Sequence, residues 1–223
     1  MPVDLTHIHV LRQRSREHKT RLLSYCRSLV FYTIRILTIA IGLYGLFFMF
    51  SDNIGSVNFK TKIEASPLFW SFHLIGGGLA LILSTFVLSS KIRRHSVAVH
   101  RYLGKFYALA ILFASVGGFV LSFETDSGLI SGFGLGLLSL FWFYATFMAY
   151  ITARNKQFKQ HKIWVYRSFV LTLSAVLFRI ELGILMEVSK HNYFDVYASV
   201  TWISWVPMLI ITEWFIINAK SNA

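Results

Sequence analysis

The chain has 223 residues, of which 55% are hydrophobic and only 14% charged, and its formal net charge is +12. A soluble domain carries about 25% charged residues, and the apolar residues here form runs too long for a soluble core, so the composition excludes a soluble globular domain. The positive charge lies between these runs, where membrane topology explains it without a nucleic-acid partner. The single cysteine, Cys26, excludes an internal disulfide and any cysteine-based metal motif.

Six apolar runs follow one another along the chain, and each is long enough to cross a bilayer. They lie at about 28–50, 68–89, 104–123, 130–152, 163–188 and 198–217. Helices of about 20 residues cross roughly 30 Å of hydrocarbon, and helices are required because backbone exposed to lipid cannot stay unpaired. The sequence therefore predicts an all-α polytopic bundle of six transmembrane helices over residues 28–217, between a basic segment, 1–27, and a short tail, 218–223.

Lysine and arginine gather in three segments: the N-terminal segment, the connection between the second and third runs, and the connection between the fourth and fifth. Their basic residues are Arg12, Arg14, Arg16, Lys19, Arg21, Arg27, Lys91, Arg93, Arg94, Arg101, Arg154, Lys156, Lys159 and Lys162. The positive-inside rule predicts that these segments and both termini face the cytoplasm. We therefore expect a multi-pass protein of the bacterial inner membrane, with anionic lipid at its cytoplasmic face.

Two similar motifs accompany the third and fifth runs. The first is His100-Arg101-Tyr102-Leu103-Gly104-Lys105-Phe106-Tyr107, and the second is His161-Lys162-Ile163-Trp164-Val165-Tyr166-Arg167-Ser168. Both histidines are expected just before their helices begin, at one membrane edge. Neutral imidazole binds metals, so His100 and His161 are candidate metal ligands, and Arg101 or Arg167 would bind anionic groups beside them. The motifs lie 61 residues apart, but the few matched positions do not establish a duplication.

These motifs, together with His73 in the second span and Arg179 in the fifth, resemble a family of predicted bacterial membrane proteins catalogued as domain of unknown function 2306. The similarity runs from about residue 73 to residue 179, over the central four spans. The matching residues are His73, His100, Arg101, Gly104, Tyr107, His161, Trp164, Arg167 and Arg179. Lys105 and Lys162 stand where the pattern has arginine, and Val165 stands where it has methionine. The resemblance implies a membrane protein but no activity, because the family is defined by sequence.

Several ionisable residues lie within the predicted spans, where their burial is costly and marks functional candidates. His73 is in the second span, and Arg179 and Glu181 are in the outer half of the fifth. They form either a site or a structural hydrogen bond between these two spans. Arg35 in the first span and Glu213 in the sixth are expected to pair with each other, or Arg35 is expected to snorkel to the cytoplasmic headgroups.

Aromatic and small residues within the spans indicate close packing. Trp142 lies mid-span in an aromatic run and needs an acceptor for its N–H, so we expect helix packing there rather than a wall for a flat cofactor. Glycines at 76–78, 117–118, 132 and 136 predict helices that approach closely. Room for a planar ligand is the alternative interpretation of these glycines.

Cofactor binding is the leading functional hypothesis. His100 and His161 would hold a haem b, or a histidine pair would hold a quinone, for electron transfer through the membrane. His73 and His191 would form a second pair near the outside, as in small two-haem cytochromes with six helices. The candidate cofactor-binding residues are therefore His73, His100, Arg101, His161, Arg167 and Arg179.

Two alternatives from other classes remain open. A proton-coupled or anion transporter would use His73, Arg179 and Glu181, although no span is expected to be broken by proline and only Pro207 lies within one. A non-enzymatic subunit or assembly factor would bind anionic lipid, a partner protein or a second copy of the chain through its basic face. Hydrolase chemistry is not indicated, since the sequence has no nucleophile-elbow, zinc-protease or P-loop motif.

Overall fold

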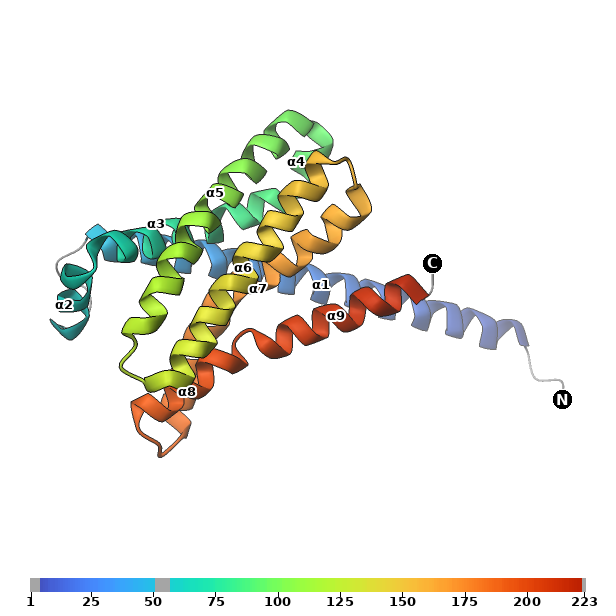
Figure 1. Ribbon diagram of the computed structural model, residues 1–223. Coiled ribbons are helices and arrows are strands. Elements are labelled where there is room, and N and C mark those ends of the chain that lie inside the picture. The colour runs from blue at the N-terminus through green and yellow to red at the C-terminus, as the bar shows by residue number, and fades with distance from the viewer. Residues whose placement is uncertain (1–4, 51–56, 222–223) are drawn as a thin grey trace. The chain divides into compact units, whose positions relative to one another are not determined.

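The computed structural model describes residues 5–50 and 57–221, and every regular element in these ranges is helical (Figure 1). The elements are α1 (Leu5–Phe50), α2 (Val57–Ala65), α3 (Pro67–Val87), α4 (Ser90–His95), α5 (Val97–Leu121), the short 3-10 helix η1 (Ser122–Glu124), α6 (Gly128–Arg154), α7 (Phe158–Val188), α8 (Tyr193–Ile203) and α9 (Val206–Ser221). The predicted side chains of Arg12, Arg14, Arg16, Lys19 and Arg27 lie outside the described part of the chain.

Six segments are long and apolar enough to span a membrane. They are Arg21–Met49, Pro67–Val87, Val97–Glu124, Gly128–Arg154, Phe158–Val188 and Tyr193–Ala219. The predicted all-α fold with six spans is therefore confirmed. The orientation of the spans, with both termini in the cytoplasm, stays a prediction.

The chain divides into two compact units, residues 1–37 and 38–223. In the first unit, the guanidinium of Arg35 lies 5.4 Å from the centre of the Phe31 ring on the same helix. All of the predicted cofactor-binding residues belong to the second unit.

Two helices begin earlier than the apolar runs predict. Helices α5 and α7 start at Val97 and Phe158, so His100 and His161 are each the fourth residue of a helix. The expectation that both histidines precede their helices is therefore wrong. Hydropathy marks where lipid contact begins, whereas a helix begins where its backbone is capped. In α5 the Ser96 side chain accepts a hydrogen bond from the Val99 amide at 3.3 Å.

The sixth span is interrupted, contrary to the expectation that proline breaks no span. Helix α8 ends at Ile203 and α9 begins at Val206, one residue before Pro207. Proline has no N–H to donate to the preceding turn, and its ring clashes with that turn. The chain turns at Ser204 and Trp205, and the Ser204 amide still donates to the Val200 carbonyl at 3.2 Å.

Helices α3, α5, α6 and α7 form a closed ring. In this ring α3 packs against α5, α5 against α6, α6 against α7, and α7 against α3. A methyl group added at Gly76 would lie 2.6 Å from the Ala110 carbonyl oxygen, and one added at Gly117 would lie 2.5 Å from that of Phe69. Only glycine permits these approaches of α3 and α5, so the predicted close packing is confirmed.

The ring consists of two similar helical hairpins. Helices α3 and α6 begin at Pro67 and Gly128, and α5 and α7 begin at Val97 and Phe158, so both pairs of starting points are 61 residues apart. Each hairpin contains two spans, which gives both hairpins the same direction across the membrane. This correspondence supports the duplication that the two motifs suggest only weakly, and it makes α5 and α7 equivalent helices on opposite sides of the ring.

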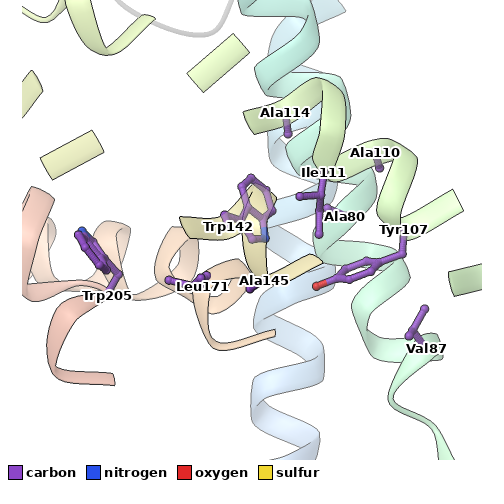
Figure 2. Close-up of a cluster of buried hydrophobic side chains, with 10 residues drawn as sticks. All are labelled: Ala80, Val87, Tyr107, Ala110, Ile111, Ala114, Trp142, Ala145, Leu171 and Trp205. Carbon is purple, nitrogen blue, oxygen red and sulfur yellow. The ribbon is translucent and has the colours of Figure 1, made fainter. Parts of the chain in front are cut away.

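Buried side chains from α3, α5, α6, α7 and the α8–α9 turn fill the bundle (Figure 2). Ile111 and Ala114 of α5 are fully buried, and Leu171 of α7 is 2% exposed. Figure 2 shows Tyr107 and Trp142 directed toward one another from α5 and α6. The polar ends of these two aromatic side chains therefore meet inside the apolar core.

Candidate functional site

The basic connections lie at one end of the bundle. Helix α4, the first turns of α5 and α7, and the α6–α7 connection share this end (Figure 1). Its exposed basic residues are Lys91, Arg93, Arg94, Arg101, Lys105, Arg154, Lys156, Lys159 and Lys162. Lys105 lies 5.6 Å from the Tyr102 ring centre and Lys162 lies 5.8 Å from that of Tyr166, so each ammonium folds along its own helix. We call this surface the basic end.

A hydrogen bond orients the His161 ring at the basic end. Its Nδ1 lies 2.8 Å from the carbonyl oxygen of Ala149 on α6. A carbonyl oxygen can only accept, so Nδ1 carries the proton and donates it. In the neutral ring Nε2 therefore presents a lone pair, which is the arrangement found in metal-ligating histidines.

The His100 ring is incompletely bonded. Its Nδ1 is buried and has no hydrogen-bond partner among the described residues. Buried polar atoms of this kind are uncommon and point to an additional group such as a ligand or water. His100 lies within electrostatic range of His161 and Arg93. The two motif histidines, far apart in sequence, therefore share one neighbourhood.

Open space adjoins His100 along its own helix. Gly104 is one turn further along α5, on the same face as His100, and a methyl group placed on it would meet nothing within 4 Å. This glycine differs from Gly76 and Gly117, where close helix contact forbids a side chain. Because Gly104 has no side chain, it leaves space at the basic end. It does not serve to bring two helices into contact.

A buried hydrogen-bond network lies two turns below the histidines and connects α5, α6 and α7. The Tyr107 hydroxyl lies 2.7 Å from Thr172 Oγ1 and 3.1 Å from Ser168 Oγ. Trp142 donates its indole N–H to Thr172 at 2.9 Å, and Thr146 lies 2.7 Å from Ser168. Tyr107 and Ser168 each follow a motif histidine by seven residues, so the two motifs meet in this network.

Each donor in this network is accounted for. Thr172 donates to the Ser168 carbonyl at 2.9 Å and Thr146 donates to the Trp142 carbonyl at 2.8 Å. Tyr107 and Trp142 must then donate to Thr172, and Ser168 donates to Thr146 or Tyr107. The hydroxyl protons end on backbone carbonyls, which cannot pass a proton on. The network therefore joins the helices and is unsuited to proton relay.

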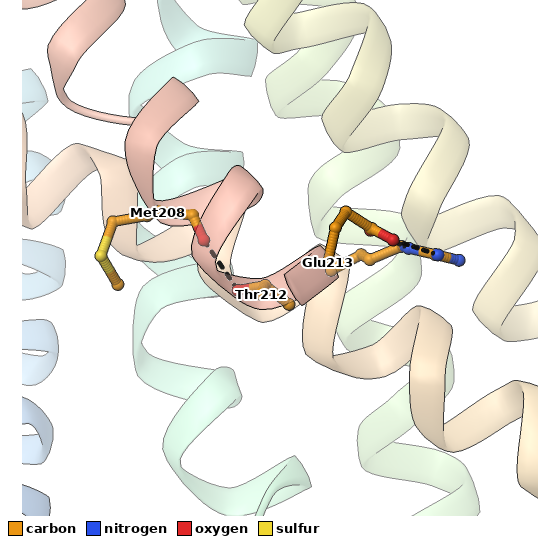
Figure 3. A network of polar contacts seen from close by, with 4 residues as sticks. Met208, Thr212 and Glu213 are labelled. Carbon is orange, nitrogen blue, oxygen red and sulfur yellow. Dashed lines mark hydrogen bonds and ion pairs between the residues drawn. The ribbon is translucent and has the colours of Figure 1, made fainter. Parts of the chain in front are cut away.

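An ion pair joins α7 to α9. Arg167 donates from Nε to Glu213 Oε1 at 2.5 Å and from Nη2 to Oε2 at 2.7 Å (Figure 3). The guanidinium also lies 4.2 Å from the centre of the Trp164 ring. On α9, Thr212 donates to the Met208 carbonyl at 2.8 Å. The charge of Arg167 is thus balanced within the protein, whereas Arg101 is exposed.

The other candidate residues lie in the opposite half of the bundle. His73 donates from Nδ1 to the Ala114 carbonyl at 3.3 Å, across the α3–α5 contact. Arg179 donates to the Ala175 carbonyl of its own helix at 2.7 Å. His73 lies within electrostatic range of Arg179, and Glu181 Oε2 is buried without a partner among the described residues. His191, the expected partner of His73, is exposed in the α7–α8 connection.

Sequence reasoning missed the partners of two predicted residues. The sequence does not predict the pairing of Arg167 with Glu213, because these residues are 46 positions apart and no sequence pattern links them. The contact of Tyr107 with Ser168 could have been predicted from the equal spacing of seven residues behind each histidine.

No group of three or more histidine, cysteine, aspartate or glutamate side chains that would hold a metal occurs in the described part of the chain.

The six spans, the buried helix ring and the histidines at its basic end define an integral α-helical membrane protein with a candidate polar site at one bilayer surface. The chain belongs to the family described as "Predicted membrane protein (DUF2306)", whose sequence profile matches residues 70–216. The match covers α3 to α9 and so extends beyond the expected four spans into the sixth. No curated protein and no solved structure matches the chain.

Proposed function

We propose that this membrane protein binds a redox cofactor, haem or quinone, at its basic end through His100 and His161, for electron transfer in the bacterial inner membrane. The observation that carries the proposal is the His161 Nδ1 hydrogen bond to Ala149, which leaves Nε2 available. His100 lies within electrostatic range, with a buried nitrogen that lacks a partner among the described residues. An oriented His161 ring and a His100 ring with an unpartnered nitrogen, on two equivalent helices, are suited to a shared ligand.

The exposed cations of the basic end support the same site. A haem carries propionates and a reduced quinone can carry negative charge, and both are stabilised by nearby lysine and arginine. Arg101 is the available arginine of the first motif, because Arg167 already pairs with Glu213. Anionic lipid would occupy the surrounding surface through the remaining basic residues.

The transporter alternative has less support. It would need a connected path through His73, Arg179 and Glu181. The hydrogen bonds of the first two run to carbonyls, at Ala114 and Ala175, rather than to one another. A role as a subunit or assembly factor remains the alternative if the basic end binds only lipid or a partner protein.

Cofactor content of the purified protein tests the proposal. The protein would be extracted from its native membrane in mild detergent, its oxidised and reduced absorption spectra recorded, and its bound quinone extracted into solvent and quantified. We expect about one cofactor per chain in the wild type and loss of the cofactor in His100→Ala and His161→Ala. The exposed His191→Ala is the matched control. A wild-type protein with no more haem or quinone than the double variant His100→Ala/His161→Ala would contradict the proposal.

A further inference from the structure

We infer that, of the two cofactor classes, the site takes a quinol, one of whose hydroxyls donates to Nε2 of His161. This inference rests on the proposed function and narrows it to one ligand chemistry. It follows from the protonation of the ring, from the space beside Gly104 and from the packing below the histidines.

His161 offers a hydrogen-bond acceptor to a ligand. Because the Ala149 carbonyl holds the Nδ1 proton, neutral His161 meets a ligand with a lone pair. A quinol hydroxyl is a donor and satisfies that lone pair. A quinone carbonyl or a quinol ether offers only acceptors there, and neither forms this hydrogen bond with the neutral ring.

The second step concerns the space. A single six-membered ring needs a small opening beside His100, and the position of Gly104 provides it, since nothing lies within 4 Å of a methyl group added there. His100, with its unsatisfied Nδ1, lies one turn from this opening on the same helix face. It takes the opposite end of the ring.

The third step excludes the larger cofactor. A haem held between His100 and His161 would extend its macrocycle down between α5 and α7. That region holds Tyr107, Thr172 and Trp142, whose polar atoms are already hydrogen-bonded to one another and whose side chains are buried. Inserting a porphyrin would break these buried hydrogen bonds without replacing them. A ring bound at the level of the first helical turn leaves the network intact.

The fourth step concerns depth. His100 and His161 lie in the first turns of α5 and α7, beside the lysines and arginines of the basic end. Cationic side chains of this kind mark the bilayer surface. A quinol carries a polar head on an apolar tail, so its head fits this level while the tail stays in the bilayer.

Binding of three related ligands to the protein in phospholipid nanodiscs tests the inference. The probes are a decyl-substituted benzoquinol kept under anaerobic reducing conditions, the corresponding quinone, and the dimethyl ether of the quinol. Binding is measured by isothermal titration calorimetry, with protein-free nanodiscs subtracted for partition into lipid. The quinol is expected to bind about tenfold more tightly than its ether, as the loss of one good hydrogen bond to a buried acceptor implies. In His161→Ala this preference for the quinol should shrink, because the hydroxyl at the His161 end has lost its acceptor.

Two glycine variants test the position of the ligand. Gly104→Leu fills the space beside His100 and should weaken quinol binding about tenfold or more without lowering the melting temperature. Gly183→Leu makes the same change on α7, at another glycine where nothing lies within 4 Å of an added methyl group, and should bind as the wild type does.

Four results would overturn the inference. Equal affinities for quinol and ether in the wild type would show that His161 is not the acceptor. Unchanged binding in Gly104→Leu would show that the ligand does not bind beside Gly104. Co-purified haem that is lost in His100→Ala would refute the quinol and leave the proposed function standing. Absence of haem together with no binding of any probe would refute both.

Discussion

The role of a histidine in a membrane span depends on its hydrogen bonds and on the packing around its ring. His73 and His161 both donate Nδ1–H to a carbonyl of a neighbouring helix, Ala114 in one case and Ala149 in the other. His73 lies within a tight helix contact, since a methyl group added at Gly118 would lie 3.0 Å from its Nδ1. His161 lies at the open basic end. The same hydrogen bond therefore joins helices at one position and orients a ligand-capable ring at the other.

The Arg167–Glu213 pair gives a prediction at the level of residues. Glu213→Gln should lower the free energy of unfolding by about 1–2 kcal/mol, because a partly buried guanidinium loses its bidentate carboxylate. The side chains are 19% and 35% exposed, which limits the effect. Thermal unfolding in detergent measures it.

The control for this prediction is another ion pair of the same chain. Lys62 and Asp126 are 31% and 62% exposed, so Lys62→Gln should change stability by less than about 0.5 kcal/mol. Equal effects of Lys62→Gln and Glu213→Gln would show that the Arg167 pair contributes no more than a surface contact.

At the level of elements, the contact between α3 and α5 depends on glycine. Gly76→Ala should destabilise the protein by about 2 kcal/mol or more, because the new methyl group would lie 2.6 Å from the Ala110 carbonyl and the backbones must separate. Gly77→Ala is the matched control on the same helix, where nothing lies within 4 Å. It should be neutral or slightly stabilising, since alanine favours helix. Similar melting temperatures for the two variants would contradict the close α3–α5 contact.

The hydroxyl network gives a second prediction for the helices. Tyr107→Phe should cost about 1 kcal/mol, because the helices lose a buried hydrogen bond between α5 and α7. Tyr102→Phe removes the same hydroxyl from the same helix at a position 62% exposed and should change stability little. Chemical denaturation in detergent compares them, and an equal cost for both variants would refute the buried network.

The sequence predicts the elements well and their ends less well. Six spans follow from hydropathy alone, because length and lipid exposure constrain them. The starts of α5 and α7 and the break before Pro207 were missed, because capping and backbone hydrogen bonds decide them rather than apolarity. For the site, the motifs indicate His100 and His161 as a pair. The free Nε2 of His161 could not be predicted, because it depends on a hydrogen bond to the backbone carbonyl of Ala149, and the identity of a side chain does not reveal such a bond.

For the whole molecule, the distribution of charge predicts the direction of insertion. Cys26 is the only cysteine, so a Cys26→Ser protein accepts single labels. Lys159→Cys at the basic end should react with a membrane-impermeant maleimide only after the membrane is opened. Lys190→Cys, in the α7–α8 connection at the other end, should react in intact cells. Labelling of Lys159→Cys in intact cells would reverse the predicted orientation.

The equal spacing of the two hairpins places a histidine at the same position in each of them. Equivalent helices α5 and α7 start 61 residues apart and each has histidine as its fourth residue. The two hairpins differ in side chains, because Tyr107 in one corresponds to Ser168 in the other, and these two contact each other. A site between equivalent helices provides two similar groups for one ligand.

The central claim, that His161 offers a free Nε2 to a ligand beside His100, is tested most directly by nitrogen NMR. The protein labelled with ¹⁵N-histidine contains eight histidines, and His161→Ala assigns the signals of His161. In the neutral ring we expect a protonated Nδ1 and an unprotonated Nε2 whose resonance shifts when quinol is added. A His161 ring protonated at Nε2 alone, or an Nε2 resonance that does not move with any haem or quinol ligand, would contradict it.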